Sequence, residues 1–192
     1  FASLNQCLRG RLTDIKRNQN VLIHIDLLAQ LAKNSLTYFA HPATERDSKQ
    51  GRVKIELPNA WHYQTQITVQ IGDINYGNHL SNDAFLRLAH EARLRFLKHF
   101  GYSEMDIAGV GLIMADAAIQ FKNQAFHGDV LNISIAVTDI GRAGFTLIYL
   151  FERTSDGQQI GRIKNGMVFY DYQQQCVANT PAAFSVAFAT DH

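Results

Sequence analysis

A long helix with an unusually wide apolar stripe limits the folds open to this chain. Between residues 82 and 100 apolar side chains recur every three or four positions, which is the spacing of one buried helix face. They are Phe85, Leu88, Ala89, Ala92, Phe96 and Phe100. Three further leucines widen this stripe: Leu86, Leu94 and Leu97. Because the stripe exceeds what a single surface contact needs, other structure must cover much of the helix circumference.

The segments on either side of this helix have the pattern of β-strands. Residues 64–71 alternate between polar and apolar side chains, as a half-buried strand does. Four further strand-like segments, separated by short turns, follow the helix at residues 110–121, 131–138, 145–151 and 160–172. Strands joined by short turns lie antiparallel, and a single sheet must curl around one helix to bury it. The pattern therefore predicts an α+β hot-dog fold, in which a curled antiparallel sheet of about five strands wraps one long central helix.

The first sixty residues differ from the rest in composition and pattern. Residues 28–39 place apolar side chains at helical spacing, and residues 41–52 are typical of a solvated linker. Residues 1–60 carry nine Lys and Arg against five Asp and Glu, whereas the remainder carries nine against twelve. We therefore expect residues 1–60 to be an extension with one amphipathic helix and a linker, and residues 61–192 to be the hot-dog domain.

Charge, cysteine content and hydropathy exclude several classes of protein. The net charge of +1 over 192 residues provides no argument for binding nucleic acid. Cys7 and Cys176 cannot form a disulfide framework, and nothing near them resembles a metal-binding pair. We expect no metal, no cofactor and a reducing, cytoplasmic compartment. No apolar run reaches the ~20 residues of a membrane span, and the nearest, residues 21–40, is interrupted by polar side chains.

A polar loop lies between the first strand and the helix. Its sequence, DINYGNHLSN (73–82), combines an acid, three asparagines, a histidine and a glycine. Ser81 or Asn82 can cap the helix, and Asp83 suits the positive end of the helix dipole. A helix N-terminus supplies unpaired backbone N–H groups, and such groups stabilise a developing oxyanion. The loop therefore predicts a site at which a carbonyl group is polarised.

The loop and the helix resemble a known family. The segment VQIGDINYGNHLSNDAFLRLAHEARLRFLKHFGYSE (69–104) resembles the entry segment of the hot-dog acyl-CoA thioesterases, the 4-hydroxybenzoyl-CoA thioesterase-like group. FHGDVL (126–131) resembles the turn of that group into its next strand. The similarity covers about residues 61–190. It implies hydrolysis of acyl-CoA or acyl-carrier thioesters in a dimer-interface pocket at the N-terminus of the central helix.

The family pattern of the loop is Asp-x-Asp-x-x-Gly-His-x-Asn-Asn, and this chain departs from it at the second acid and at the glycine. Asp73 falls on the first acid and His79 on the histidine. Asn75 falls on the second acid, which is often assigned to attack on the thioester or to activation of water. The glycine stands one place early, as Gly77, and Asn78 occupies its position. Catalysis by a carboxylate at position 75 is therefore impossible here.

The resemblance implies that the catalytic residues are Asp73, Asn75, His79 and Glu91. His79 can act as a general base, and Asp73 can orient it or cap the end of the strand. Asn75 can position a water or hold the thioester carbonyl, or it can bond only the backbone of its own loop. Glu91 lies on the helix, where some hot-dog thioesterases place their base. It can equally form solvated ion pairs with the arginines one helical turn away.

Five further residues are candidates for substrate binding. Asn78 and Asn82 stand in the loop motif, although Asn82 can also cap the helix. Asp116 is an acid inside an apolar strand, where it becomes base-like if it is buried and stays an ordinary acid if it faces solvent at an edge. CoA is anionic, and Lys122 and Arg142 are the cations that suit its tail. Candidates for an apolar acyl pocket, which core packing explains equally well, are Met114, Phe121, Phe126, Phe145 and Tyr149.

Two alternative functions remain open at the level of sequence. Hot-dog hydratases and dehydratases pair an Asp and a His in a loop that resembles Asp-x-Asn-Pro-x-His, but no proline follows Asn75 and His79 lies one residue too far along. A hot-dog protein that binds acyl-CoA without turnover is the other alternative, and Asn75 supports it. A single sheet around one helix leaves an exposed edge, and assembly as a homodimer or homotetramer protects such an edge.

Overall fold

The computed structural model describes residues 53–189, and the amphipathic helix expected at residues 28–39 lies outside them. In this described part, two helices and a short 3₁₀ helix accompany the sheet: η1 (Ile71–Asp73), α3 (Asn82–His99) and α4 (Ala182–Ala187). The strands are β1 (Tyr63–Thr68), β2 (Gly111–Phe121), β3 (Val130–Thr138), β4 (Gly144–Arg153), β5 (Gln159–Asp171) and β6 (Cys176–Val177). Within residues 53–189 no helix is both long and apolar enough to cross a membrane.

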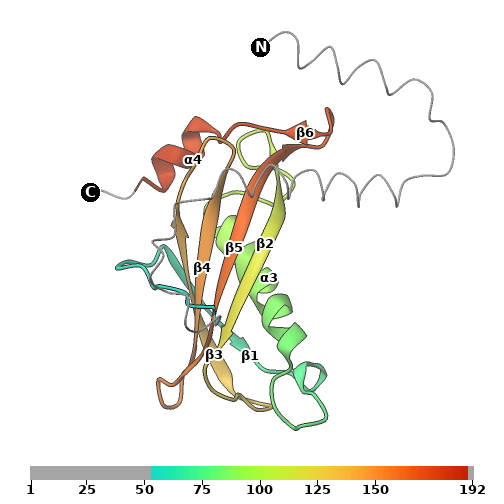
Figure 1. The fold of residues 1–192 in the computed structure, drawn as a ribbon, viewed down its shortest axis with the longest axis vertical. Helices are drawn as coiled ribbons and strands as arrows, with labels where there is room; N and C mark the ends of the chain where they lie inside the picture. The colour runs from blue at the N-terminus through green and yellow to red at the C-terminus, as the bar shows by residue number, and fades with distance from the viewer. Residues whose placement is uncertain (1–52, 190–192) are drawn as a thin grey trace, which may run out of the picture. The chain divides into compact units, whose positions relative to one another are not determined.

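The strands form one antiparallel sheet with α3 along one face (Figure 1). Their order is β1-β3-β4-β5-β2, and the two residues of β6 pair with the end of β5. The connection from β1 through α3 to β2 therefore spans the width of the sheet, and the remaining strands fill the space between them. This arrangement confirms the predicted hot-dog fold. The boundary that we placed at residue 60 stays a prediction.

The core lies between α3 and the inner face of the sheet. Alternate residues of β3 and β4 point toward the helix and are buried, as the period of two predicts. On β3 and β4 these residues are Leu131, Ile133, Ile135, Val137, Phe145, Leu147, Tyr149 and Phe151. The helix stripe is covered on most of its width, but Leu94 is 41% exposed. The helix is therefore left open on this side, where the sequence predicted cover.

The outer face of the sheet is partly covered by the segment that precedes β1. Ile55 is buried, and its carbonyl accepts a hydrogen bond of 2.9 Å from Nη1 of Arg162 on β5. Residues 54–58 line a shallow depression together with Thr138, Asp139, Ile148 and Lys164. The chain before β1 therefore contributes to the packing of this domain from at least Ile55 onward.

The end of the sheet near α4 is filled by aromatic rings. Phe184 on α4 packs against Phe145 and Phe169, with ring centroids 4.5 and 5.2 Å apart. Phe188 follows α4 and reaches Phe96 near the C-terminal end of α3 at 5.5 Å. All five side chains are buried. The short terminal helix therefore closes the core at this end.

His62 links β3 to this aromatic cluster, and its packing predicts that stability depends on pH. Its Nδ1 accepts a hydrogen bond from the backbone N–H of Val137, and its ring packs edge-on against Phe188. Burial lowers the pKa of His62 below its ordinary value of 6.5. As pH falls through about 6.5, the unfolded chain takes up a proton that the folded chain does not. The contribution of His62 to the free energy of unfolding is therefore full above this pH and is lost below it.

We expect urea unfolding of the wild type to show this loss between pH 7.5 and 5.5. A His62→Asn variant keeps an acceptor for the N–H of Val137 but does not titrate, so its stability should change less over the same range. Other histidines contribute equally to both proteins and cancel in the difference. Parallel pH profiles for the two proteins would contradict this prediction.

Candidate active site

The polar loop forms a tight turn against the N-terminus of α3. The backbone N–H of Asn75 donates to the carbonyl of His79 (3.0 Å), and Asn78 donates to the carbonyl of Asn75 (3.0 Å). Asn78 has a left-handed backbone with φ of 62°. Asparagine is one of the few residues besides glycine that adopts this conformation readily. This explains why the chain tolerates Asn78 in the position of the family glycine.

His79 is oriented by the backbone of the residue that follows it. Its Nδ1 lies 3.2 Å from the carbonyl oxygen of Leu80. Because a carbonyl oxygen only accepts hydrogen bonds, Nδ1 carries the proton, and the neutral ring keeps its lone pair on Nε2. A Cβ atom added to Gly77 would lie only 3.1 Å from Nε2, so glycine keeps the space beside this nitrogen open. The half-exposed imidazole is therefore arranged to accept a proton at Nε2.

The side chain of Asn75 also lies beside Gly77. Its Oδ1 accepts a 2.8 Å hydrogen bond from the N–H of Gly77, which is a turn closed by a side chain onto its own backbone. The same atom lies 3.1 Å from a Cβ added to Gly77. Oδ1 of Asn75 and Nε2 of His79 thus both lie beside the same glycine. In this arrangement the oxygen of Asn75 supports the loop that carries His79.

Asp73 holds the loop to the helix. Its buried carboxylate accepts hydrogen bonds from the N–H of Gln70 (2.9 Å) and from Nη2 of Arg87 (3.2 Å). Its backbone carbonyl accepts from the N–H of Ser81 (2.8 Å). The guanidinium of Arg87 also binds the carbonyl of Gly72. From sequence, Asp73 could either orient His79 or cap the end of the strand. Its contacts match the second role.

The cap of α3 is Ser81, whose Oγ accepts from the N–H of Ala84 at 3.3 Å. Asn82, considered as a cap from sequence, is instead the first residue of the helix and is exposed. Asp83 forms an ion pair with Arg87. Hydrogen bonds from Ser81 and Arg87 lower the pKa of Asp83, which keeps a negative charge beside the positive end of the helix.

Glu91 lies far along α3 from this loop. It forms an ion pair of 2.7 Å with Nε of Arg95, and Nη1 of Arg95 donates to the carbonyl of Gln66 on β1. Ten residues separate Glu91 from Ser81, and at 1.5 Å per residue this is roughly 15 Å of helix. The chain therefore does not bring its own Glu91 to His79. Of the two ion pairs predicted for Glu91, the one with Arg95 forms. The one with Arg87 does not form, because Arg87 binds Asp73 and Asp83 instead.

Asp116 lies on the edge strand β2, at a bulge between Met114 and Asp116. It is exposed, and its Oδ1 accepts a 3.1 Å hydrogen bond from the N–H of Gly166 on β5. A Cβ on residue 166 would lie 2.5 Å from Oδ2 of Asp116, so a larger residue there would displace this carboxylate from its present position. The carboxylate of Asp116 thus accepts a backbone N–H group at the point where the bulge interrupts the strand pairing. The burial that would make it base-like is not found.

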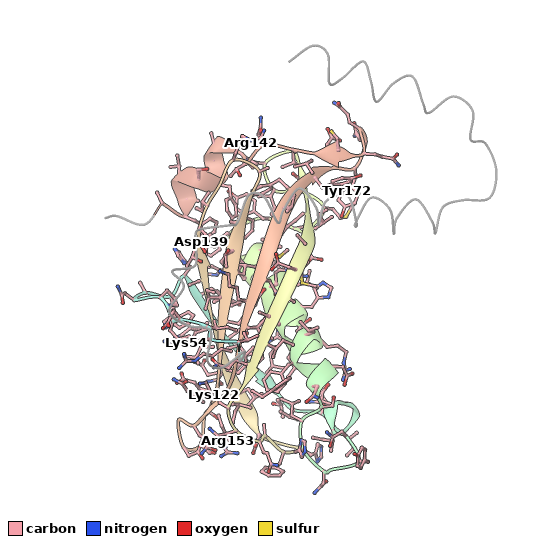
Figure 2. The ribbon with its side chains drawn as sticks, viewed as in Figure 1. Lys54, Lys122, Asp139, Arg142, Arg153 and Tyr172 are labelled. Carbon is pink, nitrogen blue, oxygen red and sulfur yellow. The ribbon has the colours of Figure 1, made fainter. Side chains whose placement is uncertain are left out.

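The two candidate cations lie at opposite ends of the sheet (Figure 2). Lys122 follows β2 in the turn that contacts the polar loop, where Ala125 accepts from the N–H of Leu80 at 2.8 Å. Arg142 lies near α4, and its Nη1 donates to Asn179. Of these two cations, Lys122 is therefore the one that belongs to the turn in contact with the polar loop.

The candidate acyl-pocket residues divide into two groups. Phe145 and Tyr149 are part of the core, as are their neighbours on β4. Burial raises the pKa of the Tyr149 hydroxyl to about 12. Met114, Phe121 and Phe126 are exposed, and the ring of Phe121 packs edge-on against Phe85 of α3 at 5.1 Å. These three exposed side chains are available to an apolar ligand.

Comparison with known proteins identifies the family. The family model described as the thioesterase-like superfamily matches residues 69–188, and the chain belongs to this superfamily. A protein of Aquifex aeolicus (strain VF5) that is provisionally named an esterase is 32% identical over 74 residues, which are 38% of this chain and 56% of that protein. The chain therefore spans about half the length of the curated relative that it matches.

Solved structures show the same fold. A 1,4-dihydroxy-2-naphthoyl-CoA thioesterase from Synechocystis superposes with a TM-score of 0.61 at 21% identity, covering 66% of this chain and 95% of that chain. An aspartate-to-asparagine variant of 4-hydroxybenzoyl-CoA thioesterase, complexed with 4-hydroxybenzoyl-CoA, superposes with a TM-score of 0.59 at 19% identity, covering 66% and 97%. The hot-dog fold of the described residues is thus that of solved thioesterases.

Proposed function

We propose that the chain hydrolyses acyl-CoA thioesters at the junction between the polar loop and α3. The observation that carries this proposal is the orientation of His79, whose Nδ1 is bonded to the carbonyl of Leu80 and whose Nε2 is left to accept a proton. Membership of the thioesterase-like superfamily supports the class of reaction. The solved relatives named for aryl-CoA thioesters support CoA as the carrier.

The proposed mechanism uses water as the nucleophile. Nε2 of His79 removes a proton from water, and the resulting hydroxide forms a C–O bond to the thioester carbonyl carbon. N–H groups in the first turn of α3 stabilise the negative oxygen of the intermediate. The C–S bond then breaks, and the proton on Nε2 passes to the departing sulfur of CoA. The products are a carboxylic acid and free CoA thiol.

Asn75 has a supporting role in this mechanism. An amide side chain does not take a proton at neutral pH, so Asn75 cannot replace the acid of the family pattern. Its bond to the N–H of Gly77 maintains the turn that places His79. The aspartate-to-asparagine variant of 4-hydroxybenzoyl-CoA thioesterase is complexed with its substrate. This supports the view that a hot-dog thioesterase with asparagine in place of an aspartate can still bind a thioester.

The experiment that tests this function is release of free thiol from a panel of aryl-CoA and fatty acyl-CoA substrates. Thiol release by the wild-type chain is the expected result. Hydration of an enoyl-CoA without thiol release would identify a hydratase instead. Binding of acyl-CoA with neither reaction would identify a binding protein without turnover.

We also propose that the chain forms a homodimer through the edge strand β2. Among the described strands, β2 is bonded on one side to β5 and ends the sheet on the other. Exposed apolar side chains, Met114 and Phe121, lie along this edge. A long edge of this kind favours pairing with a second copy.

Sedimentation velocity at micromolar concentration should therefore give about twice the chain mass of 21.6 kDa. A Met114→Glu variant should shift the equilibrium toward monomer, because pairing along this edge would bury an unpaired charge. The control is Val186→Glu, which adds the same charge on α4 at a side chain that is 79% exposed. A monomeric wild type would contradict the proposal, and so would equal dissociation of both variants.

A further inference from the structure

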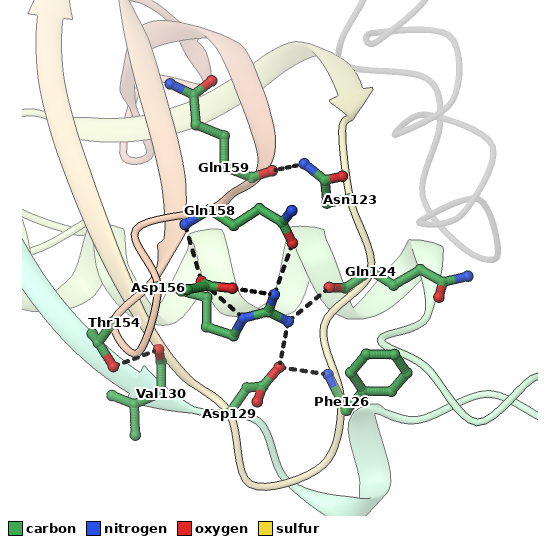
Figure 3. Close-up of polar contacts among 10 residues, drawn as sticks. Asn123, Gln124, Phe126, Asp129, Val130, Thr154, Asp156, Gln158 and Gln159 are labelled. Atoms are coloured by element: carbon green, nitrogen blue, oxygen red, sulfur yellow. Dashed lines mark hydrogen bonds and ion pairs between the residues drawn. The ribbon is translucent and has the colours of Figure 1, made fainter.

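Arg153, at the end of β4, uses its whole guanidinium group in hydrogen bonds (Figure 3). Nε and Nη2 bind the two carboxylate oxygens of Asp156 at 3.1 and 2.7 Å. Nη2 also donates to Oε1 of Gln158 (2.7 Å). Nη1 donates to Oδ2 of Asp129 and to the backbone carbonyl of Gln124, each at 3.2 Å. All five N–H donors of the side chain are therefore engaged, and the side chain is only 14% exposed.

These bonds join two separate loops. Asp156 and Gln158 belong to the hairpin between β4 and β5, whereas Gln124 and Asp129 belong to the turn between β2 and β3. Oδ2 of Asp129 also accepts from the N–H of Phe126 within that turn (2.9 Å). The planar fork of an arginine can bind this set of partners together, whereas the single ammonium of a lysine cannot.

The turn at residues 123–129 also forms hydrogen bonds with the polar loop and with the segment that precedes it. The backbone of Val69 exchanges hydrogen bonds with this turn, donating to the carbonyl of Asp129 (2.8 Å) and accepting from the N–H of Gly128 (3.0 Å). The carbonyl of Ala125 accepts from the N–H of Leu80 (2.8 Å). The carbonyl of Leu80 is the group that orients His79. One continuous path of bonds and adjacent peptide groups therefore leads from Arg153 to the imidazole.

We propose that Arg153 is a positioning residue for His79. This inference rests on the proposed function, and it assigns to Arg153 a role that acts through the turn at 123–129. When the guanidinium is lost, the carbonyl of Gln124 and the carboxylate of Asp129 lose their common donor. The adjacent carbonyl of Ala125 then no longer fixes Leu80, and His79 loses the bond that selects its tautomer.

The test compares Arg153→Lys with the matched variant Arg162→Lys. Arg162 lies on the neighbouring strand β5 and binds the carbonyl of Ile55 and Oε1 of Gln159. Both variants keep the charge and lose a guanidinium. At a temperature well below both melting points, Arg153→Lys should lower kcat for thiol release about tenfold or more, as small misplacements of a catalytic group do. KM should stay near the wild-type value, and Arg162→Lys should retain kcat.

A second measurement does not depend on activity. In ¹⁵N spectra, with the His79 signals assigned by their loss in His79→Gln, the wild-type ring should show a protonated Nδ1 and an unprotonated Nε2. Arg153→Lys should show a mixture of tautomers, and Arg162→Lys should not. If the wild type releases no thiol, the proposed function falls, but the spectra still decide whether Arg153 positions the ring.

The inference is overturned if the Arg153→Lys spectra show the wild-type tautomer, whether or not the rate falls. It is also overturned if the tautomer changes while an active enzyme keeps its kcat. Should Arg153→Lys fail to fold, Asp129→Asn replaces it in the same measurements. That variant keeps an oxygen for the N–H of Phe126 and removes the charge that holds Arg153.

Discussion

Replacing His79 with alanine should lower kcat/KM for thioester hydrolysis by at least ~100-fold, the lower end of the contribution of a general base. His79 sits between the loop turn and the N-terminus of α3, with its Nδ1 bound to Leu80. The alanine variant retains the backbone bond between the carbonyl of residue 79 and the N–H of Asn75. The loop should therefore keep its shape, and the rate should fall because the proton acceptor is missing.

The measurement is thiol release by His79→Ala, with His127→Ala as the control. His127 is an exposed histidine in the turn beside the loop, and its loss should leave the rate near that of the wild type. A His79→Ala protein that is folded and retains the wild-type rate would place the base elsewhere. Glu91→Gln and Asp116→Asn would then show whether one of those carboxylates is the base.

Replacing Phe184 with alanine should lower the free energy of unfolding by about 3–5 kcal/mol, the usual cost of removing a buried aromatic ring. Phe184 is fully buried and packs against Phe145, Phe169 and Phe188 with ring centroids 4.5, 5.2 and 4.7 Å apart. The cavity left by the ring would lie between α4 and the sheet, where rigid strands limit its collapse.

Urea unfolding provides the measurement for this prediction. Val186→Ala is the matched control, because Val186 lies on the same short helix and is exposed, so its loss should change stability by less than about 0.5 kcal/mol. Equal effects of the two substitutions would show that α4 does not close the core. Phe184→Ala should keep its kcat/KM below its melting temperature, because α4 lies at the end of the sheet away from the polar loop (Figure 1).

The fold could be predicted from sequence because its signals are local and periodic. The stripe that includes Phe85 and Phe96 has the period of a helix, and the segment from Leu131 to Val137 has the period of a strand. Short turns left few ways to arrange the strands. The exposure of Leu94 was missed, because helical spacing does not show which part of a wide stripe the sheet covers.

The candidate site was predictable only in part. The loop motif identified the segment that contains Asn75 and His79, and the structure places both of these side chains beside Gly77. The ion pairs of Arg87 with Asp73 and Asp83 were both missed. The pair with Asp83 had a local signal, because Arg87 stands one helical turn after Asp83. Spacing along the helix suggested Glu91 as the partner of Arg87, but a loop packed across the helix end offered buried Asp73 instead.

Contacts between distant segments account for the remaining differences. Arg153 contacts Asp129 across 24 residues of sequence, and no local pattern marks it. Arg142 was selected for its charge, but the topology of β4 places it at the end of the sheet away from the loop (Figure 2). A one-residue bulge in β2 decides the surroundings of Asp116, and a bulge is not visible in an alternating pattern.

The most direct test of this account is the stoichiometry of the reaction catalysed by the wild-type chain. Free CoA thiol and carboxylic acid should be measured together on one accepted acyl-CoA, at several enzyme concentrations. Hydrolysis predicts that the two products appear in equal amounts, at a rate proportional to enzyme and strongly reduced in His79→Ala. Saturable binding of the acyl-CoA with no release of either product would contradict the account.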